Sequence, residues 1–238
     1  MKKEIYFKKF NELTERAFLR DHHMHTSWTH AEDSVEDMVK AAEEKGLLSI
    51  AFTEHVNSVV KWYHDFAKKV RDVAKLSKLD IFLSAEAKII DYQGNIDISK
   101  YILNLADFVV GSVHRYPLGS KKFLPLEEIP SLGQEKAAKM EFDAARSILN
   151  CEHADVLGHP FGVYSRYFKQ FPEKEMYILM QESLNKRKAI EINTSYNYGK
   201  EFITLLREVN PFVSIGSDAH RKEDIQKEFS QIKRNILL

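Results

Sequence analysis

Short apolar runs alternate with helical patterns along this chain of 238 residues, giving seven strand–helix units. The stretch after Ser34, for example, has apolar residues at helical spacing until Gly46, and the buried run Leu47–Phe52 follows it directly. Strands separated by helices pair in parallel through right-handed crossovers. Seven such units without a break in composition predict a closed or nearly closed α/β barrel, with a doubly wound open sheet as the competing architecture.

The composition limits the class of protein. Apolar residues make up 44% of the chain, and the 35 basic and 35 acidic side chains cancel, so no long nucleic acid is expected as a partner. The single cysteine, Cys151, excludes an intrachain disulfide and a cysteine-based metal site. The N-terminus lacks the apolar segment of a signal peptide, and no run approaches the roughly 18 apolar residues that span a bilayer. We therefore expect a cytoplasmic protein without membrane contact.

Histidines and acids gather just past the apolar runs. The carboxyl ends of parallel barrel strands open on one face, so these side chains are expected to meet at one mouth. A cluster of imidazoles and carboxylates is how a multi-metal site is built. The strand exits carry, in chain order, Asp21–His25 with His30, then Glu54 and His55, Glu86, His114, His159, and Asp218 with His220.

Two pairs of residues at opposite ends of the chain have the same spacing. His23 and His25 are two apart on the first strand and would point to the same face. Asp218 and His220 repeat this spacing on the last strand, which closes beside the first strand in a barrel. The fold therefore predicts that the two pairs are adjacent. Two long loops, 115–133 and 161–171, are expected to overhang the same mouth.

Glu86 follows the third apolar run and is expected to point into the mouth. A carboxylate that faces two cations can bridge them, which one imidazole cannot do. Without metal, so many convergent ionisable groups would carry a heavy desolvation cost. Divalent ions remove that cost, because they keep the carboxylates ionised and the imidazoles neutral.

The ordered motifs D-x-H-x-H, E-H, E, G-S-x-H, G-H-P and S-D-x-H resemble the PHP (polymerase and histidinol phosphatase) family over residues 21–220. The resemblance implies a single domain over residues 1–238 with a distorted, TIM-like (β/α)7 barrel and three metals at its mouth. It places His23, His25, Glu86 and Asp218 around one ion, and Glu86, His114 and His159 around the second. The third ion would be held by His30, His55 and His220.

Segments 111–114 and 191–195 look most like the histidinol-phosphatase branch of that family. The resemblance implies a metal-dependent phosphomonoesterase that hydrolyses a small phosphorylated metabolite, as in histidine biosynthesis. We expect a hydroxide bridging two ions to attack the phosphorus in line. Glu86, Asp218 and His220 are the expected catalytic residues, and Asp218 or His220 would pass a proton to the leaving alkoxide.

Positive charge near the mouth is expected to hold the phosphate. Arg166, in the loop after the Gly158–Pro160 exit, is the first candidate, followed by Arg115, with Arg221 and Lys88 as further candidates. Three divalent ions are the expected cofactors, and imidazole–carboxylate sites accept zinc, manganese and iron.

Three other functions compete with this hypothesis. A PHP-type phosphodiesterase acting on a nucleotide has the same metal requirement. A carbon–nitrogen hydrolase related to the amidohydrolases also begins with H-x-H on its first strand. A metal-storage protein or an inactive barrel is the non-enzymatic alternative, although degenerate barrels usually lose several ligands and all nine positions are filled here.

Overall fold

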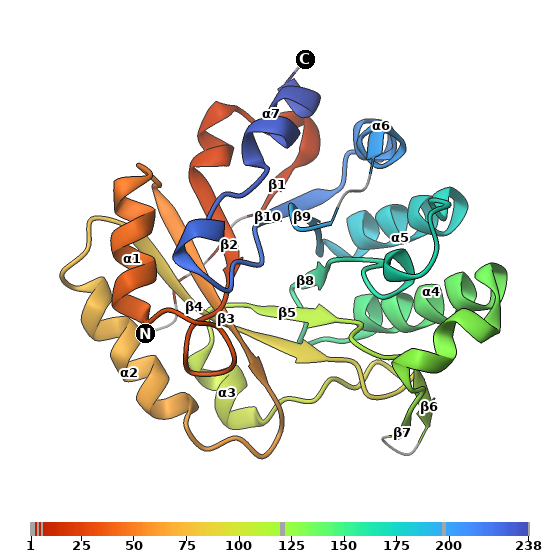
Figure 1. Cartoon of the computed structure of the whole chain (residues 1–238), viewed down its shortest axis with the longest axis horizontal. Coiled ribbons are helices and arrows are strands. Elements are labelled where there is room, and N and C mark those ends of the chain that lie inside the picture. The colour runs from red at the N-terminus through yellow and green to blue at the C-terminus, as the bar shows by residue number, and fades with distance from the viewer. Residues whose placement is uncertain (1–2, 4, 6, 120–121, 197–198, 238) are drawn as a thin grey trace.

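The computed structural model describes residues 3, 5, 7–119, 122–196 and 199–237. Its centre is a curled eight-stranded sheet in the order β1-β10-β9-β8-β5-β4-β3-β2 (Figure 1). Seven of these strands run parallel, and β1 joins β10 in antiparallel orientation. The strands are β1 Lys8–Lys9, β2 Arg20–Met24, β3 Ser49–Val56, β4 Asp80–Lys88, β5 Val109–Ser112, β8 Val156–Gly158, β9 Ala189–Asn193 and β10 Phe212–Gly216.

Helices surround the outside of the curled sheet (Figure 1). They are α1 Val35–Glu44, α2 Tyr63–Ala74, α3 Lys100–Leu105, α4 Gln134–Asn150, α5 Glu173–Lys186, α6 Gly199–Val209 and α7 Phe229–Leu237. Short 3₁₀ helices cover Phe10–Glu12, Glu15–Leu19, Leu126–Leu132, Tyr164–Arg166 and Lys222–Asp224. The expected distorted, TIM-like α/β barrel is therefore confirmed. No helix in the described ranges is both long and apolar enough to cross a membrane.

Alternation along the strands divides the barrel interior into layers. Ala51, Phe82 and Val110 form part of a separate buried apolar cluster at the amino ends of β3, β4 and β5. Two residues further along come hydroxyl side chains, and two residues beyond those come His55, Glu86 and the His114 that follows β5. The chain thus places an apolar floor beneath a polar mouth.

The structure adds elements that the sequence patterns do not predict. Strand β4 continues to Lys88, five residues past the apolar run that ends at Leu83, because its polar residues face the barrel interior. Helix α3 and the short antiparallel strand β1 are also additions. Loop 115–133 contains a hairpin of β6, Pro117–Gly119, and β7, Lys122–Phe123.

The first and last parallel strands meet only at one end. Among the described residues, their main-chain hydrogen bonds run from Asp218 N to His23 O at 2.8 Å and from His25 N to Ala219 O at 2.9 Å. The carboxylate of Asp21 adds a link by accepting a hydrogen bond from Ser217 N at 2.9 Å. The barrel is therefore closed between β2 and β10 at the mouth and separates toward the opposite end.

Candidate metal centre

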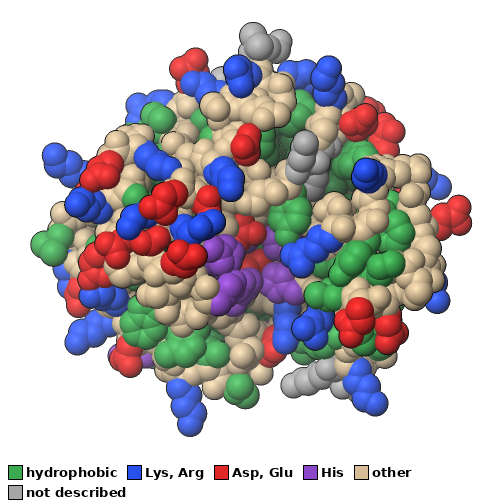
Figure 2. Space-filling view, in the orientation of Figure 1, with side chains coloured by type: hydrophobic (Ala, Val, Ile, Leu, Met, Phe, Trp, Pro, Cys, Tyr) green, Lys and Arg blue, Asp and Glu red, His purple; other side chains and the backbone are tan. Residues whose placement is uncertain are grey.

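Nine side chains predicted to bind metal lie together at the mouth of the barrel. Figure 2 shows histidine side chains gathered with acidic groups in a hollow on this face. Within the described residues, three groups of side chains have donor atoms close enough to share a cation. The donor atoms of each group all lie within 4.8 Å of one another. These groups are His23, His25 and Glu86; His55, Glu86 and His114; and His25, His55 and His220.

The first group joins β2 to β4, and Asp218, which follows β10, lies beside it. His23 Nε2 lies 3.1 Å from His25 Nε2, and His25 Nε2 lies 3.1 Å from Asp218 Oδ1. Glu86 Oε2 lies 3.6 Å from His23 Nε2 and 3.7 Å from His25 Nε2. Lone pairs that converge in this way repel one another unless a proton or a cation lies between them, so the arrangement fits a metal ion.

Glu86 also faces the other side of the mouth. Its Oε1 lies 3.0 Å from His114 Nε2 and 2.9 Å from His159 Nε2, while its Oε2 lies 2.9 Å from His55 Nδ1. Glu86 Oε2 is buried yet accepts no hydrogen bond from the described residues. A buried carboxylate with an unsatisfied oxygen between imidazoles is suited to bridge two cations.

The third group lies nearest to solvent. His220 Nε2 is 2.8 Å from His30 Nε2, and the rings of His25 and His55 stack with centroids 4.5 Å apart. His220 Nδ1 donates to the main-chain oxygen of Asp218 at 2.8 Å, which leaves its Nε2 lone pair for a ligand.

The expected division of ligands among three ions differs in detail from these groups. His55 stands with Glu86 and His114, and His25 stands with His55 and His220. His159 lies beside Glu86, and His30 lies beside His220. Neither histidine is close enough to every donor atom of a group to belong to it. The set of residues brought together matches the expectation, whereas their assignment to particular ions stays a prediction.

Burial and neighbouring charge give Glu86 and His25 the protonation states of metal ligands. Burial disfavours the Glu86 carboxylate, but the imidazoles of His114, His23 and His55 outweigh it and hold the pKa of Glu86 well below its usual range. Burial lowers the pKa of His25 to about 3. An ionised carboxylate and a neutral imidazole are the forms that bind divalent metal.

Glu191 is a supporting carboxylate that the sequence patterns do not single out as such. His23 Nδ1 donates to Glu191 Oε1 at 2.5 Å, which turns His23 Nε2 toward the centre. Glu191 Oε2 accepts a hydrogen bond from the main-chain nitrogen of His159 at 2.6 Å. One buried carboxylate on β9 thus positions two of the predicted ligands. The only signal in the sequence is an acid inside an otherwise apolar run.

Glu54 supports the loop that carries His30. Its Oε1 accepts from the main-chain nitrogen and the hydroxyl of Thr26, both at 2.7 Å, and its Oε2 accepts from the Thr29 hydroxyl at 2.5 Å. Glu54 is fully buried and points away from the donor groups, while its neighbour His55 points into them. Of the adjacent pair Glu54 and His55, Glu54 therefore supports the loop and His55 belongs to the donor groups.

Glu141 on α4 supports the loop that follows His159. This fully buried carboxylate accepts hydrogen bonds from Val163 N at 3.1 Å, Tyr164 N at 2.6 Å and the Tyr116 hydroxyl at 2.9 Å. Burial raises the pKa of Glu141 to about 7, although the three hydrogen bonds act in the opposite direction. The same loop carries Arg166, so Glu141 fixes the path of the chain toward the mouth.

The backbone at the mouth has features that only a constrained fold maintains. His159 and Asp218 both have positive φ angles, of 24° and 56°. Such angles cost energy in residues other than glycine and are found at functional sites. Gly216 permits the close approach of β2 to β10, because a Cβ at this position would overlap the Cβ of His23.

A cavity of about 460 Å³ opens over the centre. Arg166 lines it, and its Nη2 donates to the Tyr196 hydroxyl at 3.3 Å. Lys88 also lines the cavity, together with Tyr196 and Asn57, which the sequence patterns do not predict. Arg115 is exposed and is not among the described residues that line the cavity.

The two long loops differ in their relation to the mouth. Loop 161–171 contributes Arg166 to the cavity. From the described part of loop 115–133 no residue lines the cavity, although Phe123 packs beneath the Lys88 ammonium at 5.2 Å. His22, His64 and His153 stand outside the donor groups: His22 bonds to Ser49, His64 to Tyr101, and His153 pairs with Glu152.

This fold and this cluster define a barrel whose mouth carries imidazole and carboxylate groups suited to metal binding, and comparison with known proteins gives its family. The chain belongs to the PHP domain family, whose model matches residues 21–195. A relative from Caldicellulosiruptor bescii named "Probable phosphatase" is 29% identical over 217 residues, covering 85% of this chain and 80% of the relative. Another from Thermoanaerobacter sp., also named a probable phosphatase, is 27% identical over 219 residues, covering 86% and 80%.

Solved structures agree with the fold. The crystal structure of histidinol phosphate phosphatase from Lactococcus lactis, in complex with zinc, L-histidinol and phosphate, superposes with a TM-score of 0.71. It is 20% identical to this chain, and the match covers 92% of both chains.

Proposed function

We propose that this PHP-family protein is a metal-dependent phosphomonoesterase that hydrolyses a small phosphorylated metabolite, in the manner of histidinol phosphatases. The observation that carries the proposal is the convergence of nine imidazole and carboxylate side chains at the barrel mouth beside two cationic side chains. The names of the curated relatives and the structural match to a histidinol phosphate phosphatase support it.

The donor set suits divalent ions of the zinc, manganese or iron kind, because it contains only nitrogen and oxygen ligands. His23, His25, Glu86 and Asp218 would hold one ion, and Glu86 would link it to the group containing His114 and His159. Bound ions would neutralise phosphate charge and lower the pKa of a coordinated water to about 7. This water would supply the hydroxide nucleophile expected from the sequence.

The remaining roles belong to side chains of the barrel mouth. Arg166 and Lys88 would bind phosphate oxygens, and charge-assisted hydrogen bonds from an arginine suit that purpose. Asp218 or His220 would pass a proton to the leaving alkoxide. Tyr196 and Asn57 line the space beside the centre, where the organic part of the substrate would lie.

The test is a hydrolysis screen over phosphorylated metabolites, including histidinol phosphate, with manganese, zinc, iron, cobalt and magnesium supplied separately. We expect release of phosphate from at least one monoester. Failure to hydrolyse any monoester under any metal contradicts the proposal, and faster cleavage of a phosphodiester than of every monoester favours the phosphodiesterase alternative.

Variants then connect activity to the centre. Glu86→Gln and Asp218→Asn keep the size of each side chain but remove a negative charge from the donor set, so both activity and metal content should fall. Glu152→Gln is the matched control, because its side chain is exposed and it lies away from the mouth. Full activity in metal-loaded Glu86→Gln or Asp218→Asn protein would contradict the assignment of activity to this centre.

A further inference from the structure

A second cavity lies at the opposite end of the barrel from the metal centre. It occupies the place where β2 and β10 separate, and its volume is about 120 Å³. Strand β1 and the 3₁₀ helix Glu15–Leu19 close its sides. We call it the seam pocket, and the residues that give it its chemistry are Lys8, Leu13, Arg16, Arg20, Ser214 and Ile215.

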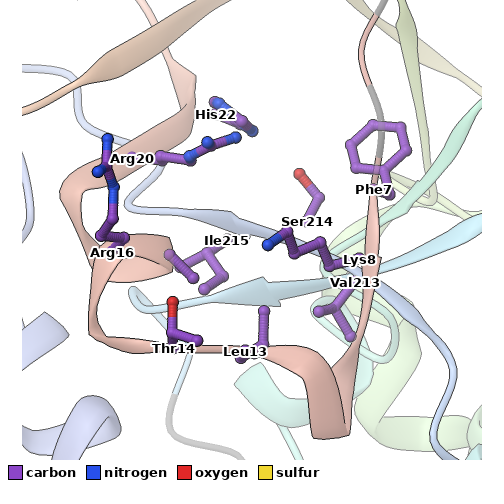
Figure 3. A pocket seen from close by; sticks show the side chains of 11 residues that line it. Phe7, Lys8, Leu13, Thr14, Arg16, Arg20, His22, Val213, Ser214 and Ile215 are labelled. Atoms are coloured by element: carbon purple, nitrogen blue, oxygen red, sulfur yellow. The ribbon is translucent and has the colours of Figure 1, made fainter.

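One side of the seam pocket is polar and the other apolar. Figure 3 shows Arg20 and Ser214 on one side, Leu13 and Ile215 on the other, and the Lys8 side chain reaching between them. Ser214 and Ile215 are buried, Arg20 is half-buried, and Lys8 is exposed. The pocket therefore combines a fixed apolar surface with cationic groups near solvent.

The cations of the seam pocket have no partner of opposite charge among the described residues. Within the described ranges, no acidic residue lines the pocket, and none lies within ion-pair distance of Lys8, Arg16 or Arg20. Three cations placed around one cavity repel one another, and an anion bound there relieves that repulsion.

We infer that the seam pocket binds a small organic anion that carries one compact apolar group. The anionic group, a carboxylate or a phosphate, would lie against Arg16, Arg20 and Lys8. The two arginines suit bidentate contacts, and the lysine acts as a point charge. The apolar group would lie against Leu13 and Ile215. A cavity of about 150 Å³ is known to hold a benzene ring, so a volume of this order fits one ring or a short branched chain.

This site does not depend on the activity proposed above. It is lined by Arg20 and His22 of β2 and by Val213, Ser214 and Ile215 of β10, whereas Asp218 lies beyond the carboxyl end of β10. The residues that line the seam pocket and those that line the mouth cavity have no member in common.

The test uses 4-fluorobenzoate as probe, with binding to the metal-loaded protein followed by fluorine NMR. We expect saturable binding, and no binding of the neutral analogue 4-fluorobenzamide. Arg20→Gln removes one charge-assisted contact and should weaken binding about 10-fold or more. Ala17→Leu fills the cavity from its edge and should weaken binding to a similar extent without removing charge.

Arg146→Gln is the matched control, because it makes the same substitution on α4, away from the seam pocket. Binding in this variant should equal that of the unmodified protein. Absence of saturable binding overturns the inference. Binding that Arg20→Gln and Ala17→Leu leave unchanged also overturns it, because the probe would then occupy the metal centre or another surface.

Discussion

Glu141 gives a quantitative test of how burial controls the charge of the supporting groups. Burial raises its pKa from 4.5 to about 7. The folded state therefore binds more protons than the unfolded state between these two pH values, so the contribution of Glu141 to stability falls as pH rises through that window. A shift of this size corresponds to about 3 kcal/mol, at about 1.4 kcal/mol for each pH unit.

The perturbation is Glu141→Gln, which cannot ionise and keeps one acceptor oxygen, whereas Val163 N and Tyr164 N donate to different oxygens of Glu141; the loss of one of these bonds does not depend on pH. Urea denaturation at pH 5, 6, 7 and 8 gives the free energy of unfolding of both proteins. We expect the variant to gain stability relative to the unmodified protein as pH rises, by up to about 3 kcal/mol between the lowest and highest pH.

The control is Glu135→Gln, whose side chain is exposed on the same helix and should show no such change with pH. A stability difference between Glu141→Gln and the unmodified protein that does not vary with pH refutes the reasoning. A difference of opposite slope would mean that the three hydrogen bonds outweigh burial and keep the carboxylate ionised.

Three further predictions concern the centre and its scaffold. Glu191→Gln should lower metal affinity about 10–100-fold in calorimetric titration, because His23 loses its charged hydrogen-bond partner, and unchanged affinity would contradict this role. Gly216→Ala should abolish metal loading, measured by elemental analysis, since the new Cβ overlaps His23; normal loading would show that the strands can separate at no cost. Ser34→Ala removes the α1 capping-box hydrogen bond from Asp37 N to the Ser34 hydroxyl and should lower the unfolding free energy by about 1 kcal/mol, whereas no loss in urea denaturation would contradict it.

Much of the fold could be predicted because its periodicities are local. The capping box at Ser34 and the positive φ of Gly46 place α1 where the sequence pattern predicts it. Strand β4 was predicted to end near Leu83 because its next residues are polar, yet it continues to Lys88. Polarity usually marks solvent, but in this barrel it also marks an interior layer beneath the centre.

The candidate site was predicted as a set of residues, because strand exits of a parallel barrel meet at one face whatever the detailed packing. Its supporting contacts could not be predicted. Glu191 and His23 are 168 residues apart, and their hydrogen bond depends on the register between β9, β10 and β2. Arg115 was predicted to bind substrate from its place after His114, but the turn into β6 leaves its side chain exposed and outside the mouth cavity.

The meeting of β2 with β10 at the mouth has a consequence for the order of assembly. His23 and His25 are synthesised well before Asp218 and His220, since 193 residues separate His25 from Asp218. A nascent chain therefore lacks the Asp218 carboxylate, which faces both histidines, until β10 has been made. An ion bound between these residues would then hold the first and last parallel strands of the sheet together.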